Sequence, residues 1–190
     1  MATEGEGLLG RVVASIARAT EATPSGRVEK SILSQAAESY ARRPVGAEQT
    51  IPTGFDPAAA SLFEAVIEAA FLVANADGEF DETERQTFET VVAEACANTV
   101  QRGSLHALVS DLLEQLEEDG FDQRVKMVSL VVQTDQQRVE VLRIAALMAY
   151  VSGGVDDSER RILDQLAERF GLGSSEVDDA LSQAVKALEP

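Results

Sequence analysis

The chain has 190 residues, of which 33 are Asp or Glu and 16 are Lys or Arg, so its formal net charge is −17. Apolar residues make up 45% of the sequence, which is typical of a globular chain and excludes a largely disordered one. The charge excludes a general nucleic-acid-binding protein, because neutralising phosphates requires a surplus of Lys and Arg, and it argues against docking on an anionic membrane. It favours a cation or a basic protein as the partner.

The negative charge is unevenly distributed along the chain. Residues 1–55 carry six acidic and six basic side chains, so the whole net charge of −17 falls on residues 56–190. The change coincides with the stretch from Pro44 to Pro57, which also holds Pro52 and two glycines, a composition typical of a linker. The sequence therefore predicts a neutral N-terminal helical extension and linker over residues 1–55, followed by an acidic helical domain over residues 56–190.

Two short amphipathic helices are expected in residues 1–55, because apolar residues recur there at helical spacing. Their apolar positions are Leu8, Leu9, Val12, Val13 and Ile16 in the first, and Val28, Ile32, Leu33, Ala36 and Tyr40 in the second. Neither helix buries enough surface to be stable alone. They must pack on the acidic domain, pair with another chain to form a homo-oligomer, or stay partly mobile.

The acidic region is expected to be all helical, starting at Asp56-Pro57, where an N-cap oxygen precedes a proline at the first helical position. Leu62 to Ala76 and Val139 to Val151 are apolar nearly all round, which predicts two buried helices. The other expected helices have apolar residues on one face only, as surface helices do. Residues 125–132 are rich in β-branched residues, but no strand is predicted nearby, so we expect a short helix. The fold class is thus all-α: a compact bundle of about seven helices plus N-terminal accessory helices.

A short acidic motif follows each of the two buried helices. Ala-Asp-Gly-Glu-Phe-Asp-Glu-Thr-Glu-Arg begins at residue 76, and Val-Ser-Gly-Gly-Val-Asp-Asp-Ser-Glu-Arg begins at residue 151. The two align without gaps, which pairs Gly78 with Gly153, Phe80 with Val155, Asp81 with Asp156, Glu84 with Glu159 and Arg85 with Arg160. The pattern predicts two pseudo-equivalent hairpins, each formed by a buried helix, a glycine turn and an amphipathic helix.

This motif resembles the tellurite-resistance TerB family, whose wider superfamily includes the N-terminal region of the co-chaperone DjlA. Ala76, Asp77, Gly78, Phe80 and Glu84 fit the family's turn, and the resemblance extends over about residues 57–188. It implies an all-α domain of two helical halves and a cytoplasmic, non-enzymatic role in stress-response complexes, with acidic residues associated with metal binding. The second turn departs from the pattern, because Ser152 stands where the first turn has Asp77.

Helix capping explains most of the shared residues. Asp81 with Glu84, and Asp156 with Glu159, have the spacing of a capping box, in which each side chain accepts from the backbone amide of the other. Gly78 and Gly153 fit the left-handed C′ position that ends a helix. Asp77 is left over, because it is placed at the C-terminal end of a helix, where the helix dipole disfavours a carboxylate.

A divalent-cation site is the alternative interpretation. Asp77, Glu79, Asp81 and Glu84 could converge on a hard cation such as Ca²⁺ or Mg²⁺, with Asp156 and Glu159 as a weaker second copy. The stretch is not a standard EF-hand, because Val73 would occupy the first ligand position.

Three functions are compatible with these features. The favoured one is a non-catalytic TerB-like interaction or scaffold module that recruits a protein with a basic surface in a cytoplasmic, tellurite-resistance-type stress response. The second is a cation sensor that uses the acidic turn around Asp77. The third is a helical enzyme with Asp81 and Glu84 as paired carboxylates, ranked last because capping leaves them exposed and without a partner base.

Other classes of site and location are excluded by what the sequence lacks. Cys96 and His106, the single cysteine and histidine, exclude an intramolecular disulfide and a Cys/His zinc cluster. The chain begins without the basic segment of a signal peptide, and its unbroken apolar runs are shorter than a bilayer-crossing helix, so no direct membrane insertion is expected.

Overall fold

The structure is a computed structural model that describes residues 4–18, 30–44, 54–151 and 154–189. In these ranges the chain forms nine helices and no strand, as the all-α prediction requires, and an isolated antiparallel bridge joins Arg18 to Lys30. The helices are α1 (Glu4–Ile16), α2 (Ile32–Tyr40), α3 (Pro57–Ala74), α4 (Glu82–Ala95), α5 (Arg102–Asp119), α6 (Phe121–Val131), α7 (Asp135–Ala149), α8 (Asp157–Phe170) and α9 (Ser174–Leu188). Helices α3 to α9 form the acidic region, and α1 and α2 precede it.

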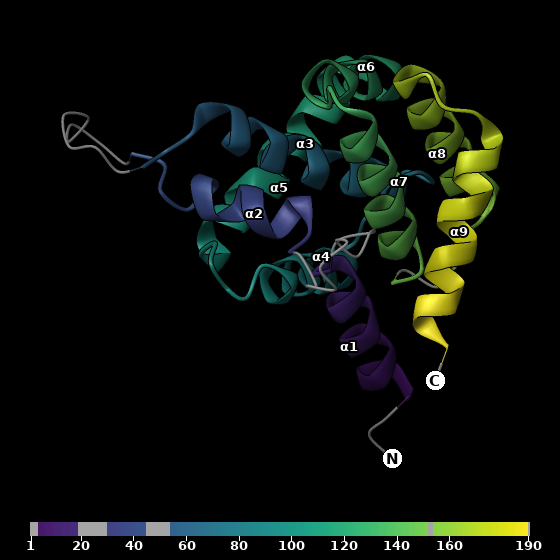
Figure 1. Ribbon diagram of the computed structural model, residues 1–190, viewed down its shortest axis with the longest axis horizontal. Helices are drawn as coiled ribbons and strands as arrows, with labels where there is room; N and C mark the ends of the chain where they lie inside the picture. Colours follow the sequence, from purple (N-terminus) through teal and green to yellow (C-terminus); the bar gives the residue numbers. More distant parts are fainter. Residues whose placement is uncertain (1–3, 19–29, 45–53, 152–153, 190) are drawn as a thin grey trace, which may run out of the picture.

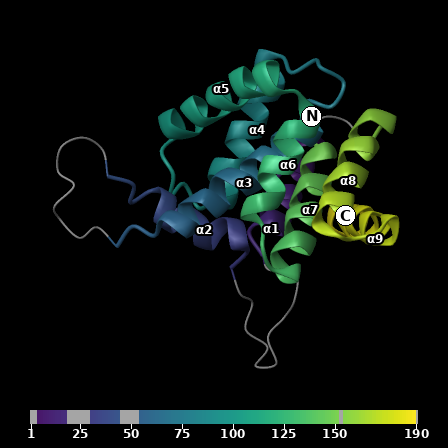
Figure 2. The ribbon, with the colours of Figure 1, turned by 90° about the horizontal axis from the view of Figure 1, so that it is seen from above.

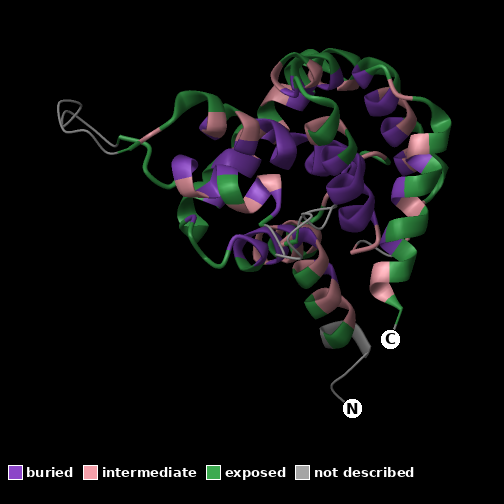
Figure 3. Cartoon of the chain, viewed as in Figure 1, coloured by how far each residue is buried: buried purple, intermediate pink, exposed green. Residues whose placement is uncertain are grey.

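The two helices predicted to be buried, α3 and α7, form the centre of the molecule (Figure 1). They pack directly on each other, and both are buried over most of their length (Figure 3). This follows from their sequence, because a helix with apolar residues on every face has no polar face to present to water and is therefore buried. Asp56 caps the start of α3 as predicted, with its Oδ1 accepting from the amide of Ala58 at 2.9 Å.

The remaining helices of the acidic region surround α3 and α7, and each of them turns its one apolar face toward the core. Figure 2 shows α5 toward one side of α3, and α8 and α9 beyond α7 on the other side. The β-branched segment after Gly120 is a helix, α6, as predicted, and it buries Val125 and Val128 against α3 and α8. Propensity alone would favour a strand there, but packing decides the conformation.

The N-terminal helices pack on the acidic region, which is the first of the three arrangements expected for them. Val12 and Ile16 of α1 and Leu33 of α2 are at most 1% exposed and belong to the same hydrophobic core as α3 and α7. Helix α2 lies along α3, and α1 contacts α4, α7 and α9. The ring of Tyr40 lies 4.6 Å from that of Phe63, centroid to centroid. The expected linker at residues 45–53 and the apolar position Val28 lie outside the described residues.

Helix α3 is long and apolar enough to cross a membrane by length and composition alone. The expectation concerned unbroken apolar runs, and it stands, because Glu64 and Glu68 interrupt the apolar sequence of this helix. In the described structure, 61% of the helix is buried by the rest of the fold, as befits the central helix of a core.

Candidate functional site

The two acidic turns lie at the same end of the molecule. Ala74 at the end of α3 and Val151 just after α7 line one small pocket of about 200 Å³. Its other lining residues come from the first turn and from α4 and α7: Phe80, Thr83, Glu84, Thr87, Phe88 and Met148. The first acidic turn and the end of α7 therefore border a mostly apolar hollow, and Glu84 is the one carboxylate among its described lining residues.

The first turn is built differently from the prediction at two positions. Helix α3 ends at Ala74 and not at Ala76, with Asn75 as its C-cap, so Gly78 lies beyond the C′ position. Gly78 does have the left-handed backbone expected of it, with φ +81°. Asp77 is in the turn and not on the helix, and its Oδ1 accepts from the amide of Glu79 at 2.9 Å. This Asx-turn gives Asp77 a structural role that the capping pattern did not predict.

Both predicted capping boxes are present. Oδ1 of Asp81 accepts from the amide of Glu84 at 2.8 Å, and Oε2 of Glu84 accepts from the amide of Asp81 at 3.0 Å. Asp156 and Glu159 make the same two bonds at the start of α8, both 2.9 Å long. Ser152 and Gly153, which the repeat pairs with Asp77 and Gly78, lie outside the described residues.

Each turn is anchored to the core by the apolar residue that precedes its capping box. The ring of Phe80 meets Phe71 and Phe88 edge-on, with centroids 5.4 and 6.0 Å apart. Its counterpart Val155 also packs on the core, half-buried. Edge-to-face contacts of this kind are worth about 0.5–1.5 kcal/mol beyond burial. The backbone that carries the carboxylates of the first turn is thus fixed to the core through Phe80.

The arginine that ends each motif ties its helix to the next one. Arg85 binds Glu89 one turn along α4, at 3.0 Å, and also donates to the hydroxyl of Ser110 on α5, at 2.6 Å. Arg160 binds Asp164 at 3.1 Å, and on α9 it binds Asp178 at 2.7 Å. Asp164 is paired with Glu89 when the gap-free alignment of the two motifs is continued, so the repeat extends further than the turn motif.

A cation site at these turns stays a prediction. Among the residues that the structure describes, no three Asp, Glu, His or Cys side chains come together as metal ligands would. Asp77, Asp81, Glu84, Asp156 and Glu159 each accept a hydrogen bond from the backbone, whereas Glu79 is exposed. Calorimetry with Ca²⁺ and Mg²⁺ tests the cation hypothesis directly.

Replacing Asp81 by alanine is expected to lower the free energy of unfolding by about 1 kcal/mol, because the first amides of α4 lose their acceptor. Asp156→Ala should have the same effect on α8. Urea unfolding measures both changes, and Glu117→Ala, an exposed change on α5, is the control with no cap to lose. Unchanged stability of Asp81→Ala would contradict the capping role and leave that carboxylate free for a ligand.

Two ion pairs that involve buried charges, Glu68 with Arg124 and Glu140 with Arg143, were not predicted from the sequence. Nε of Arg124 donates to Glu68 of α3 at 2.6 Å, and burial nevertheless raises the pKa of Glu68. Glu140 and Arg143 lie in α7 and are 1% and 6% exposed. Burial raises the pKa of Glu140 and lowers that of Arg143. The signal was present, because a charged residue inside an otherwise apolar helix needs a partner.

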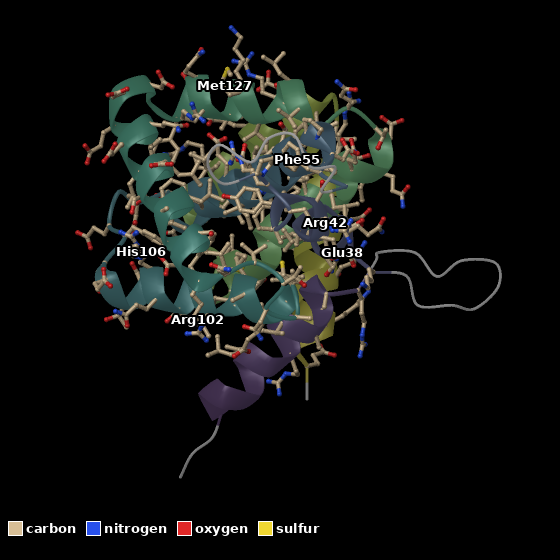
Figure 4. All side chains as sticks on the ribbon, turned by 90° about the vertical axis from the view of Figure 1, so that its left-hand side faces the viewer. Glu38, Arg42, Phe55, Arg102, His106 and Met127 are labelled. Atoms are coloured by element: carbon tan, nitrogen blue, oxygen red, sulfur yellow. The ribbon has the colours of Figure 1, made fainter. Side chains whose placement is uncertain are left out.

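Cys96 and His106 have structural roles. Cys96 is buried, and burial raises the pKa of its thiol to about 12, so it is unreactive as a nucleophile. His106 lies on the outside of α5 (Figure 4), where its Nδ1 is 3.1 Å from both Arg85 and Glu89.

Comparison with known protein families assigns most of this arrangement to a family. The family model described as tellurite resistance protein TerB matches residues 63–183, a range that begins within α3 and ends within α9. No curated protein and no solved structure matches the chain.

Proposed function

The chain belongs to the tellurite-resistance TerB family, and on that premise we propose that it is a non-catalytic adaptor that binds a basic protein partner. The binding surface is the end of the molecule where the first acidic turn and the end of α7 border the apolar pocket. We place the protein in the cytoplasm, in a stress response of the tellurite-resistance type.

The charge of the two acidic turns carries this proposal. Residues 77–84 hold five carboxylates, and residues 156–159 hold three more. The two arginines of the motifs do not neutralise them, since Arg85 and Arg160 form ion pairs with Glu89, Asp164 and Asp178 instead. A surface of this kind attracts Lys and Arg from solution, which speeds association with a basic partner and selects against acidic ones.

The pocket supplies the apolar contact that charge alone does not. With a volume of about 200 Å³, it has room for one aliphatic side chain between Phe80, Phe88 and Met148. The occupant we propose is a partner segment with one apolar residue flanked by Lys or Arg. Burial of that side chain would contribute about 1.5–3 kcal/mol, and the flanking charges would set its orientation.

A synthetic peptide with one leucine between two pairs of lysines tests this directly by NMR titration. We expect shifts centred on Ala74, Phe80 and Val151, and weaker binding when serine replaces the leucine. Glu79→Lys with Glu82→Lys should lower the affinity roughly tenfold, because two exposed charges at the pocket are reversed.

Glu114→Lys with Glu117→Lys on α5 is the matched control, since it makes the same change in net charge at exposed positions elsewhere. If both double variants lose affinity equally, or if the shifts spread over α5, the peptide is responding to overall charge and the proposed site is wrong.

A further inference from the structure

A second surface of the molecule has the opposite charge. A groove of about 400 Å³ lies between α1, α7 and α9, which meet at the lower right of Figure 1. Three arginines line it, Arg11, Arg18 and Arg143, together with Gln183, and none of its described lining residues is a carboxylate. In a chain with about twice as many acidic as basic residues, such a concentration of arginine requires an explanation.

The arginines of the groove have different roles. Arg143 is committed to the fold, because its two terminal nitrogens donate to the carbonyl oxygens of Ser15 and Arg18 at 2.9 and 2.8 Å. Arg11 and Arg18 form no ion pair within the described part of the chain. Both line the groove, Arg11 from α1 and Arg18 from the segment just after that helix.

One atom in particular indicates a missing partner. Nε of Arg11 is buried and has no acceptor among the described residues. A buried donor without an acceptor costs about 1–3 kcal/mol, more when it is charged. Nε of Arg138 is also buried without an acceptor, but that arginine forms an ion pair with Asp135, whereas Arg11 forms none within the described part of the chain. An anion in the groove would bind the guanidinium of Arg11, whose planar fork suits carboxylate and phosphate oxygens, and the side chain would have to turn toward the groove for Nε to gain that acceptor.

We propose that this groove binds a small organic or inorganic anion with at least two negative charges carried on phosphate or carboxylate oxygens. Arg11 and Arg18 hold its oxygens, and Leu147 and Ala187 offer apolar contact to its carbon part. The volume suits a small molecule. Helix α1 lies outside residues 63–183, so the site arises where this chain adds a helix to the family fold.

Pyrophosphate and citrate are the probes that separate the two oxygen chemistries. At millimolar concentration in constant chloride, at least one of them is expected to raise the melting temperature and to shift the Nε–H resonance of Arg11. Arg11→Met and Arg18→Met should each weaken binding about tenfold, since each removes one charged contact and keeps the apolar stem. Circular dichroism would confirm that both variants are folded.

Arg102→Met is the matched control, because Arg102 is an exposed arginine at the start of α5 (Figure 4) and does not line the groove. Its affinity for the probe should equal that of the unaltered chain. The proposal fails if neither probe binds, if Arg102→Met loses as much affinity as Arg11→Met, or if a hexaglutamate peptide binds and neither small anion does. None of these outcomes bears on the acidic turns, so the groove and the proposed partner site are tested separately.

Discussion

A chain shortened to residues 56–190 is expected to lose cooperative unfolding, although the neutral segment it lacks lies outside the family match. Val12, Ile16, Leu33 and Tyr40 are at most 8% exposed and fill the core shared with α3 and α7. Burial of one such side chain contributes about 1.5–3 kcal/mol. Four of them together approach the stability of a whole domain, which is about 5–15 kcal/mol.

Near-ultraviolet circular dichroism, dye binding and urea unfolding of the shortened chain measure the loss. We expect helical content without fixed tertiary packing, and exposed apolar surface on α3 that binds dye. Removal of residues 1–3 alone is the control, because none of the four buried side chains is lost with them. A monomeric chain of residues 56–190 that unfolds cooperatively would show that the N-terminal helices are an accessory.

The sequence was sufficient to predict the elements whose cause is local or periodic. Residue spacing within a few positions predicted three features: the burial of α3 and α7, which are apolar on nearly every face, the cap at Asp56 and both capping boxes. The structure confirms each of them. The internal repeat also predicted that two acidic turns are equivalent. It did not predict that the first turn and the end of α7 share a pocket, because that depends on how α3 packs on α7.

Interactions between residues far apart in the chain could not be predicted in this way. The carbonyl oxygens that Arg143 binds, those of Ser15 and Arg18, lie 128 and 125 residues before it. No pattern in either segment indicates the other. The predicted place of Asp77 was wrong for a local reason, since α3 ends at Ala74, before the expected Ala76, and the carboxylate then satisfies its own turn.

Replacing Arg143 by alanine is expected to lower the free energy of unfolding by about 3–5 kcal/mol, because it leaves Glu140 as a buried charge without its counter-ion. The substitution also removes the donors that hold the carbonyl of Ser15, near the end of α1, and that of Arg18 beyond it. Glu140 secures the other helix, since its Oε1 accepts from the amide of Ile32 at the start of α2, at 2.8 Å. Limited proteolysis should therefore cut the chain within residues 1–55 sooner in Arg143→Ala than in the unaltered chain.

Glu140→Gln separates the charge of this residue from its hydrogen bond. Glutamine can still accept from the amide of Ile32, whereas alanine cannot, so Glu140→Ala should lose more stability than Glu140→Gln, although both variants remove the counter-ion of Arg143. Burial raises the pKa of Glu140 above its usual 4.5, so the folded state binds its proton more tightly than the unfolded state. The stability contributed by that proton is complete below 4.5 and is lost as the pH rises through the raised pKa.

Glu140→Gln, which does not titrate, is therefore expected to gain stability relative to the unaltered chain as the pH rises from about 4 to about 7. Urea unfolding across that range measures the difference in the free energy of unfolding.

Arg138→Ala is the control for Arg143→Ala, because it breaks an ion pair to the exposed Asp135 on the same helix. Exposed pairs contribute at most about 1 kcal/mol, so the two arginines of α7 should differ by several-fold in effect. Equal effects would mean that the buried pair does not hold the N-terminal helices to the core.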